Sequence, residues 1–223
     1  MATALAPDDR QPADRASGIA ILAGLALSLV FVAHHPTVGS RKGPEFVSEV
    51  MSKAVPNGVV HGALIALIGV LVAGYSGLAF RLGLASLVVR AGLVAYVIGA
   101  VGWVAAALIN GFIMPAFISG YAGCRPGDLE AIRHVLALGR DANQMSSRLA
   151  VLAMSAAVAC WSVALARRGH LTTGGLGGVA ALLLSAALLS GHLPMDLHGV
   201  MAFTLVQAIW GVSIAALLIR GRV

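Results

Sequence analysis

Histidines placed at the ends of long apolar runs are the side chains in this sequence best suited to chemistry. They occur in AHHP at 33–36, in VVHG at 59–62 and in SGHLPMDLHG at 190–199. Neutral imidazole offers a lone pair near physiological pH and is a common ligand of transition metals. If the helices that carry these motifs pack side by side, their histidines meet at one end of a bundle, with a carboxylate beside them. The pattern predicts a metal site made by His35, His61, His192, Asp196 and His198, or a b-type haem held axially by two of the histidines.

Three further residues are secondary candidates for the same end of the protein. His34 is adjacent to His35, so on a helix the two side chains point about 100° apart and only one can face the bundle. The thioether of Met195 would suit a soft metal ion or haem iron. Asn110 precedes Pro115 in LINGFIMPAF at 108–117, a pattern that either breaks a helix beside a cavity or simply ends it in the headgroup region.

A structural explanation of the same residues stays open. Histidine is amphipathic and is stable in the lipid headgroup region without any ligand. Pro194 and Asp196 suit the start of a helix, where an acidic side chain gains about 0.3–1 kcal/mol from the helix dipole. Against this explanation, six of the seven histidines lie on one predicted side of the membrane and His170 alone lies on the other.

The elements that would position these residues are transmembrane helices. The chain is 59% hydrophobic and 11% charged, whereas soluble domains are about 45–50% apolar and about 25% charged. Six uncharged segments approach the roughly 20 residues that cross a bilayer. We therefore expect an all-α integral membrane protein: a tail at 1–17, then one six-helix domain at 18–223 with spans at about 18–34, 60–80, 91–112, 149–166, 172–191 and 197–219.

Two long loops, 36–59 and 113–148, are expected outside the membrane. Within the second loop, Leu129, Ile132, Val135, Leu136 and Leu138 form an apolar stripe, which predicts a short amphipathic helix on the membrane surface or over the bundle. The opposite side has short connections that each carry two arginines, Arg81 with Arg90 and Arg167 with Arg168. By the positive-inside rule we expect both termini in the cytoplasm. The protein itself is expected in the inner membrane of the cell.

Spans 1–2 and spans 5–6 share a plan. In each pair an apolar helix ends near His and Pro, and His-Gly opens the return helix. The plan suggests two related hairpins around a central hairpin, although helices rich in Ala, Leu and Val align with one another readily.

These observations favour a membrane protein with an outward-facing His/Asp site for redox chemistry or metal handling, its cofactor being a transition metal ion or haem. The alternative is a non-catalytic accessory subunit or a small-solute transporter, whose outer polar residues only cap helices. Whether the protein is an enzyme stays open. The span interiors contain almost no ionisable groups, which argues against ion-coupled transport.

The expected partners are the lipid bilayer and either another membrane protein or a second copy of this chain. Nucleic acid is not expected, because the basic residues are scattered at the ends of apolar runs.

Overall fold

The computed structural model describes residues 10–37, 43–120 and 129–223. Over these ranges the chain forms helices and no strand, and six of the helices are long and apolar enough to cross a membrane. The expected all-α architecture with six spanning helices is confirmed. The elements in chain order are α1 (Arg10–Ala33), α2 (Gly43–Leu82), α3 (Leu87–Leu108), the π-helical turn η1 (Ile109–Ile113), α4 (Met114–Ser119), α5 (Leu129–Arg167), α6 (Leu171–Leu189) and α7 (Leu197–Ile219).

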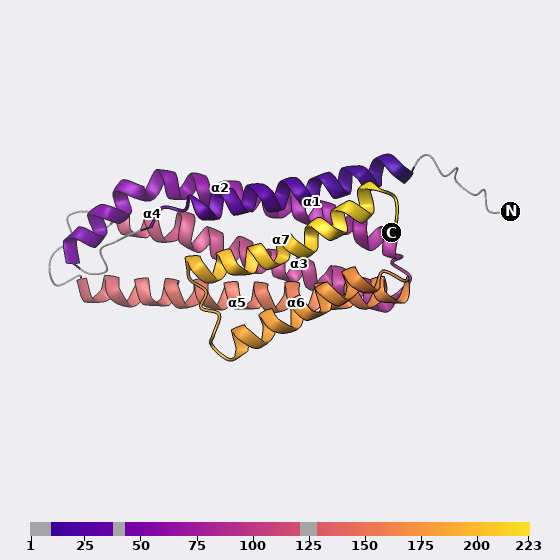
Figure 1. Ribbon diagram of the computed structural model, residues 1–223. Coiled ribbons are helices and arrows are strands. Elements are labelled where there is room, and N and C mark those ends of the chain that lie inside the picture. The colour runs from indigo at the N-terminus through magenta and orange to yellow at the C-terminus, as the bar shows by residue number, and fades with distance from the viewer. Residues whose placement is uncertain (1–9, 38–42, 121–128) are drawn as a thin grey trace.

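The spanning helices form a ring. Each of α1, α2, α3, α5, α6 and α7 packs against the next, and α7 returns to pack against α1 (Figure 1). Successive spans pack in pairs within the ring, α1 with α2, α3 with α5 and α6 with α7, and a relationship between the first and last pairs stays a prediction. One end of the ring holds His35, Asn57, Asn110 and Asp196 and is called the open end. The other, which holds Asp14, Arg81 and Arg168, is called the closed end.

Two helices are much longer than the spans expected within them. α2 has 40 residues and α5 has 39, which corresponds to about 60 Å each, twice the thickness of the hydrocarbon core. Much of the two expected loops is therefore helical. Pro56 does not stop α2, because it lies on an exposed face where the carbonyl that loses its partner can meet water.

The expected surface helix is likewise part of a longer one. Its apolar stripe forms the first turns of α5, where Ile132 is buried and the exposed Val135 and Leu138 face outward. Its expected first residues, 127 and 128, lie outside the described ranges. The physical reason is that nothing between residues 129 and 167 breaks the helix: this segment contains no proline, and Gly139 is packed against Met114.

Small residues allow α3 and α5 to lie unusually close. A Cβ atom added to Gly99 would stand 2.6 Å from Cγ of Met154, and one added to Gly102 would stand 2.8 Å from the main-chain oxygen of Ser146. Neither helix could approach this closely with a larger side chain at those glycines. Such contacts are the usual basis of helix association in membranes, where lipid tails remove the hydrophobic driving force between helices.

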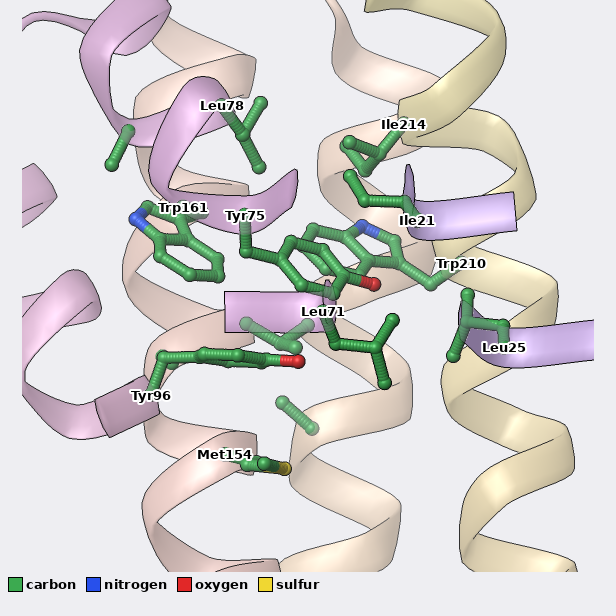
Figure 2. Close-up of a cluster of buried hydrophobic side chains, with 14 of the residues drawn as sticks. Ile21, Leu25, Leu71, Tyr75, Leu78, Tyr96, Met154, Trp161, Trp210 and Ile214 are labelled. Carbon is green, nitrogen blue, oxygen red and sulfur yellow. The ribbon is translucent and has the colours of Figure 1, made fainter. Parts of the chain in front are cut away.

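Four aromatic side chains close the interior of the ring. Tyr75 of α2, Tyr96 of α3, Trp161 of α5 and Trp210 of α7 are all buried (Figure 2). Tyr75 is nearly parallel to both tryptophans, with ring centroids 5.6 Å from Trp161 and 5.9 Å from Trp210, and its centroid is 4.7 Å from that of Tyr96. We call this layer the aromatic floor. It joins four helices through contacts at the separations that aromatic pairs prefer.

Polar contacts fasten the closed end. Nε of Arg81 lies 3.1 Å from Oδ2 of the buried Asp14, and the same guanidinium donates to the main-chain oxygen of Val223 at 2.7 Å. Arg168, after α5, donates to the main-chain oxygens of Arg81 and Leu82 at 2.8 and 2.9 Å. These bonds connect α1, α2, the α5–α6 turn and the end of the described chain below the aromatic floor.

Candidate functional site

A cavity of about 1120 Å³ runs from the open end of the ring down to the aromatic floor. Every spanning helix except α6 contributes to its described lining. On α2 the lining residues follow one another every three or four positions, so they share one helix face: Val50, Lys53, Asn57, His61, Leu64, Ile68, Leu71 and Tyr75. The stripe is polar from Lys53 to His61 and mostly apolar from Leu64 downward.

Four residues form a connected group near the open end, which we call the His61 cluster: His35, Asn57, His61 and Asn110. Nδ1 of His61 donates to the main-chain oxygen of Asn57 at 2.9 Å, because a carbonyl can only accept. In neutral His61 the lone pair is therefore on Nε2, which lies 3.3 Å from Nδ2 of Asn110 and 3.4 Å from Nε2 of His35. The two imidazole rings meet edge to face, with centroids 4.9 Å apart.

The environment keeps His35 neutral. Burial, and secondarily the charge of nearby His61, lower the pKa of His35 below its ordinary value, while a hydrogen bond to the main chain of Pro36 acts in the opposite direction. Because desolvation disfavours the charged imidazolium, His35 presents a neutral imidazole to the cavity near physiological pH.

The π-helical turn explains why Asn110 takes part in the cluster. In an α-helix the amide of Met114 would donate to the carbonyl of Asn110. Here it donates to the carbonyl of Ile109 instead. The next residue, Pro115, has no N–H to offer. The carbonyl of Asn110 is thus left without a partner inside its own helix, and Nδ2 of Asn57 donates to it at 2.9 Å. Neither expectation for Asn110 and Pro115 holds as stated: the helix neither breaks nor ends here but continues to Ser119 through the π-helical turn, and both residues line the cavity.

Gly111 allows α2 to dock on this turn. A Cβ atom at Gly111 would stand 2.4 Å from Cβ of His61 and 2.6 Å from its Cγ. Only glycine leaves room for the buried His61 at that place. The NGxxHG stretch at 57–62 and the NG pair at 110–111 therefore belong together as one interface between two helices.

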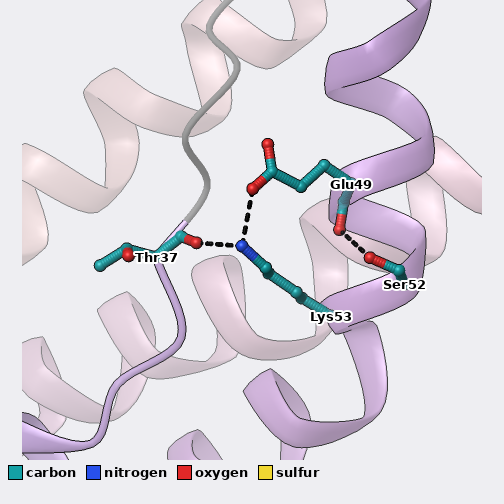
Figure 3. Close-up of polar contacts among 4 residues, drawn as sticks. All are labelled: Thr37, Glu49, Ser52 and Lys53. Atoms are coloured by element: carbon teal, nitrogen blue, oxygen red, sulfur yellow. Dashed lines mark hydrogen bonds and ion pairs between the residues drawn. The ribbon is translucent and has the colours of Figure 1, made fainter.

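An ion pair lies at the mouth of the cavity (Figure 3). Nζ of Lys53 is 2.6 Å from Oε1 of Glu49 and also donates to the main-chain oxygen of Thr37, while the hydroxyl of Ser52 donates to the carbonyl of Glu49 at 2.8 Å. Thr37 follows His35 by two residues. Lys53 thus connects the chain after α1 to the first half of α2 directly above the His61 cluster.

The opposite wall of the cavity is held by the turn between α6 and α7. Nε2 of Gln144 donates to the main-chain oxygen of Met195 at 2.8 Å, and Oδ1 of Asp196 accepts from the amide of Gly199 at 3.0 Å. The second bond makes Asp196 the N-cap of α7, immediately before the first turn, whereas Pro194, also expected at the helix start, precedes the helix. Met195 is buried and lines the cavity.

The structure brings together only part of the expected metal site. His35 and His61 meet, and Asn110 joins them. His192 is exposed and its Nδ1 lies 2.9 Å from the hydroxyl of Ser190, while His198 is exposed on the first turn of α7 and lines no part of the cavity. His34 is exposed and bonded to the carbonyl of Val30.

The expected ring of four histidines with Asp196 is therefore not formed. Among the described residues no three His, Cys, Asp or Glu side chains stand where they could hold one metal ion. The two histidines that do meet have their Nε2 atoms 3.4 Å apart, too close for a haem plane to pass between them. The expected ring of histidines fails because the helices present them differently. His61 lies on the inner face of α2 and His198 on an outer face of α7, although each precedes a glycine.

The sequence analysis gave Lys53, Asn57 and Gly111 no role in the site. The signal that could have found Asn57 and Gly111 is the repeated Asn-Gly pair, at 57–58 shortly before His61 and at 110–111 shortly before Pro115.

No protein-family model, no curated protein and no solved structure matches the chain. Six apolar helices of spanning length define a polytopic membrane protein. The cavity within its ring is the feature from which a more particular function must be argued.

Proposed function

We propose that the protein binds an amphipathic molecule in the ring cavity, with its polar head at the open end and its hydrocarbon part between the helices. The observation that carries this proposal is the change in lining along α2, from Lys53, Asn57 and His61 to Leu64, Ile68 and Leu71. A cavity of this size suits a single medium-sized ligand, since ligand sites are commonly about 300–1,000 Å³.

The charges near the mouth favour a negatively charged head group. Lys53, Arg133 and Arg140 line the upper cavity, and Asp196 is the single acidic side chain in the described lining. Glu49 offsets Lys53, and Asp141 lies 3.1 Å from Arg140. Arg133 and Arg140 project from the first half of α5, beyond the apolar part of the ring, where they can meet a carboxylate or phosphate.

The lower cavity argues against the transport of ions or small polar solutes. Its described walls below His61 are mostly apolar, with side chains such as Leu64, Ile68 and Phe203; Thr204 and Gln207 are polar but uncharged, and the aromatic floor closes the cavity. An ion-coupled transporter normally has ionisable groups at that depth. The same walls are well suited to hydrocarbon, whose burial contributes about 0.8 kcal/mol per methylene.

The proposal includes an orientation. The open end is placed outside the cytoplasm, because the short connections at the closed end carry Arg81, Arg90, Arg167 and Arg168. In this orientation, in the inner membrane, the mouth would receive its ligand from the outer leaflet or from the space outside it. Figure 1 shows α6 diverging from α5 toward the open end, where the chain from 190 to 196 connects α6 to α7.

A fluorescent fatty acid tests the proposal. The purified full chain in a mild detergent is titrated with cis-parinaric acid, whose emission rises in an apolar site. Ile68→Trp fills the cavity and should weaken binding at least about tenfold, whereas Val70→Trp places the same side chain on the exposed face of α2 and should bind as the wild type does. Equal affinities of the two variants would rule out the cavity as the binding site.

A second comparison tests the head group. Arg133→Gln combined with Arg140→Gln should weaken binding of the acid several-fold, while Arg148→Gln, on an exposed part of α5 outside the lining, should not. The methyl ester of the same fatty acid, which carries no charge, should respond to Ile68→Trp but not to the double arginine change. If the ester binds as tightly as the acid to the wild type, the anionic head group is wrong while the apolar site stands.

A further inference from the structure

The His61 cluster has a geometry that hydrogen bonding alone does not explain well. Nε2 of His61 is approached by Nε2 of His35 at 3.4 Å and by the Asn110 carboxamide at 3.3 Å. Ordinary N–H hydrogen bonds are about 2.7–3.2 Å long, so both contacts are longer than usual. His35 and Asn110 therefore each approach Nε2 of His61 across a gap slightly wider than a strong direct bond.

The same separations fit ligands that share one small cation. Imidazole nitrogens lie about 2.0–2.1 Å from zinc, and at tetrahedral angles two such ligands stand about 3.3–3.4 Å apart. The contacts that are long for hydrogen bonds are thus the expected distances between neighbouring ligands. A half-turn of the Asn110 carboxamide places its oxygen, rather than its nitrogen, toward the gap, and these two atoms are exchanged by rotation alone.

The surroundings of the gap hold the groups in place. The carbonyl of Asn57 accepts from Nδ1 of His61 at 2.9 Å, which is the arrangement that fixes a metal-ligating histidine in the tautomer with Nε2 free. The side chain of Asn57 also holds the main chain of Asn110 at 2.9 Å. Gly111 brings the π-helical turn against His61. Ligand positions are therefore set by the protein before any ion arrives.

We propose that His35, His61 and Asn110 bind a divalent transition metal ion of the zinc class through the two Nε2 atoms and the carboxamide oxygen, with the remaining coordination position open to the cavity. The site is smaller than the one expected from the sequence and uses an amide in place of a carboxylate. With two imidazoles and no anionic ligand, it binds an exchangeable ion rather than a structural one. This inference does not depend on the identity of the molecule in the cavity.

Cobalt and zinc test the site on the full chain in detergent after treatment with a chelator and its removal. Co²⁺ should produce the visible absorption bands of a four-coordinate complex at one ion per chain, and Zn²⁺ should displace it. His35→Ala and His61→Ala should each weaken binding at least about a hundredfold. His34→Ala and His198→Ala remove exposed histidines outside the cluster and should leave the spectrum and affinity unchanged.

One variant separates a ligand from a residue that only supports the fold. Asn110→Asp keeps the main-chain bond to Asn57 and replaces a weak amide ligand with a carboxylate, so it should bind Zn²⁺ at least about tenfold more tightly. If Asn110 serves only as a hydrogen-bond donor to His61, the change removes the donor and gives no gain. Absence of a cobalt spectrum in the wild type, or equal loss of binding in His34→Ala and His61→Ala, would overturn the proposal.

Discussion

Replacing Gly111 with alanine should weaken the protein where α2 docks on the π-helical turn. The added Cβ would lie 2.4 Å from Cβ of His61, about 1 Å or more short of an ordinary carbon–carbon contact of about 3.5–4.0 Å. His61 is buried and its Cβ is part of the helix framework, so no side-chain rotation relieves the contact. α2 and η1 must move apart, and the bond between Asn57 and the Asn110 carbonyl must lengthen or break.

The cost follows from these two effects. Forcing one extra carbon into a packed interior costs about 1–3 kcal/mol, and loss of a net hydrogen bond costs about 0.5–1.5 kcal/mol. We therefore expect Gly111→Ala to lower the free energy of unfolding by about 2–4 kcal/mol. The drop should appear as a lower midpoint of thermal unfolding in detergent, followed by tryptophan emission at a fixed heating rate.

A matched glycine provides the control. Gly69 lies on the exposed side of α2, and nothing stands within 4 Å of a Cβ added there, so Gly69→Ala should leave the midpoint unchanged or raise it slightly. Combining Gly111→Ala with His61→Gly removes the offending Cβ and should cost less than the two single changes added together. If Gly111→Ala is as stable as Gly69→Ala, the close approach of α2 and η1 is wrong.

Three other changes should have defined effects. Asp196→Ala removes the N-cap of α7 and should cost about 0.5–2 kcal/mol in thermal unfolding, while Asp196→Asn, which can still accept from Gly199, should cost much less. Pro115→Ala restores an N–H that can pair with a helix carbonyl, so amide hydrogen exchange at residues 109–115 should slow; unchanged exchange would contradict the role given to the proline. Arg81→Gln leaves the buried Asp14 without its cation and should lower stability by about 1–3 kcal/mol, with partial recovery in the double variant Arg81→Gln and Asp14→Asn.

The spanning helices could be predicted because their signal is local. A run of about 20 apolar residues has few alternatives to a membrane helix, whatever the rest of the chain does. The lengths of α2 and α5 could not be predicted in the same way, because Pro56 and the charged residues of 43–59 and 129–148 resemble loop sequence. Those residues form helix because they continue an already nucleated helix, for which each added residue gains a bond at little cost.

The candidate site was only half predictable for a different reason. His-Gly at 61–62 and at 198–199 look alike in sequence, yet His61 is buried and His198 is exposed. The difference lies in how each helix is rotated within the ring, which depends on tertiary contacts such as Gly111 against His61. The π-helical turn could be suspected from Asn110 and Pro115, but its partner Asn57 lies 53 residues away in the chain.

The aromatic floor has an electrical consequence. A deep, open cavity filled with water would bring the solution at the open end far into the bilayer, and the transmembrane voltage would then fall mainly across what remains below it. Tyr75, Tyr96, Trp161 and Trp210 form that remaining layer together with the closed end. About 2.3 kcal/mol per elementary charge for each 100 mV would then act over a shortened distance there, so an ion crossing the stacked rings would meet most of the field.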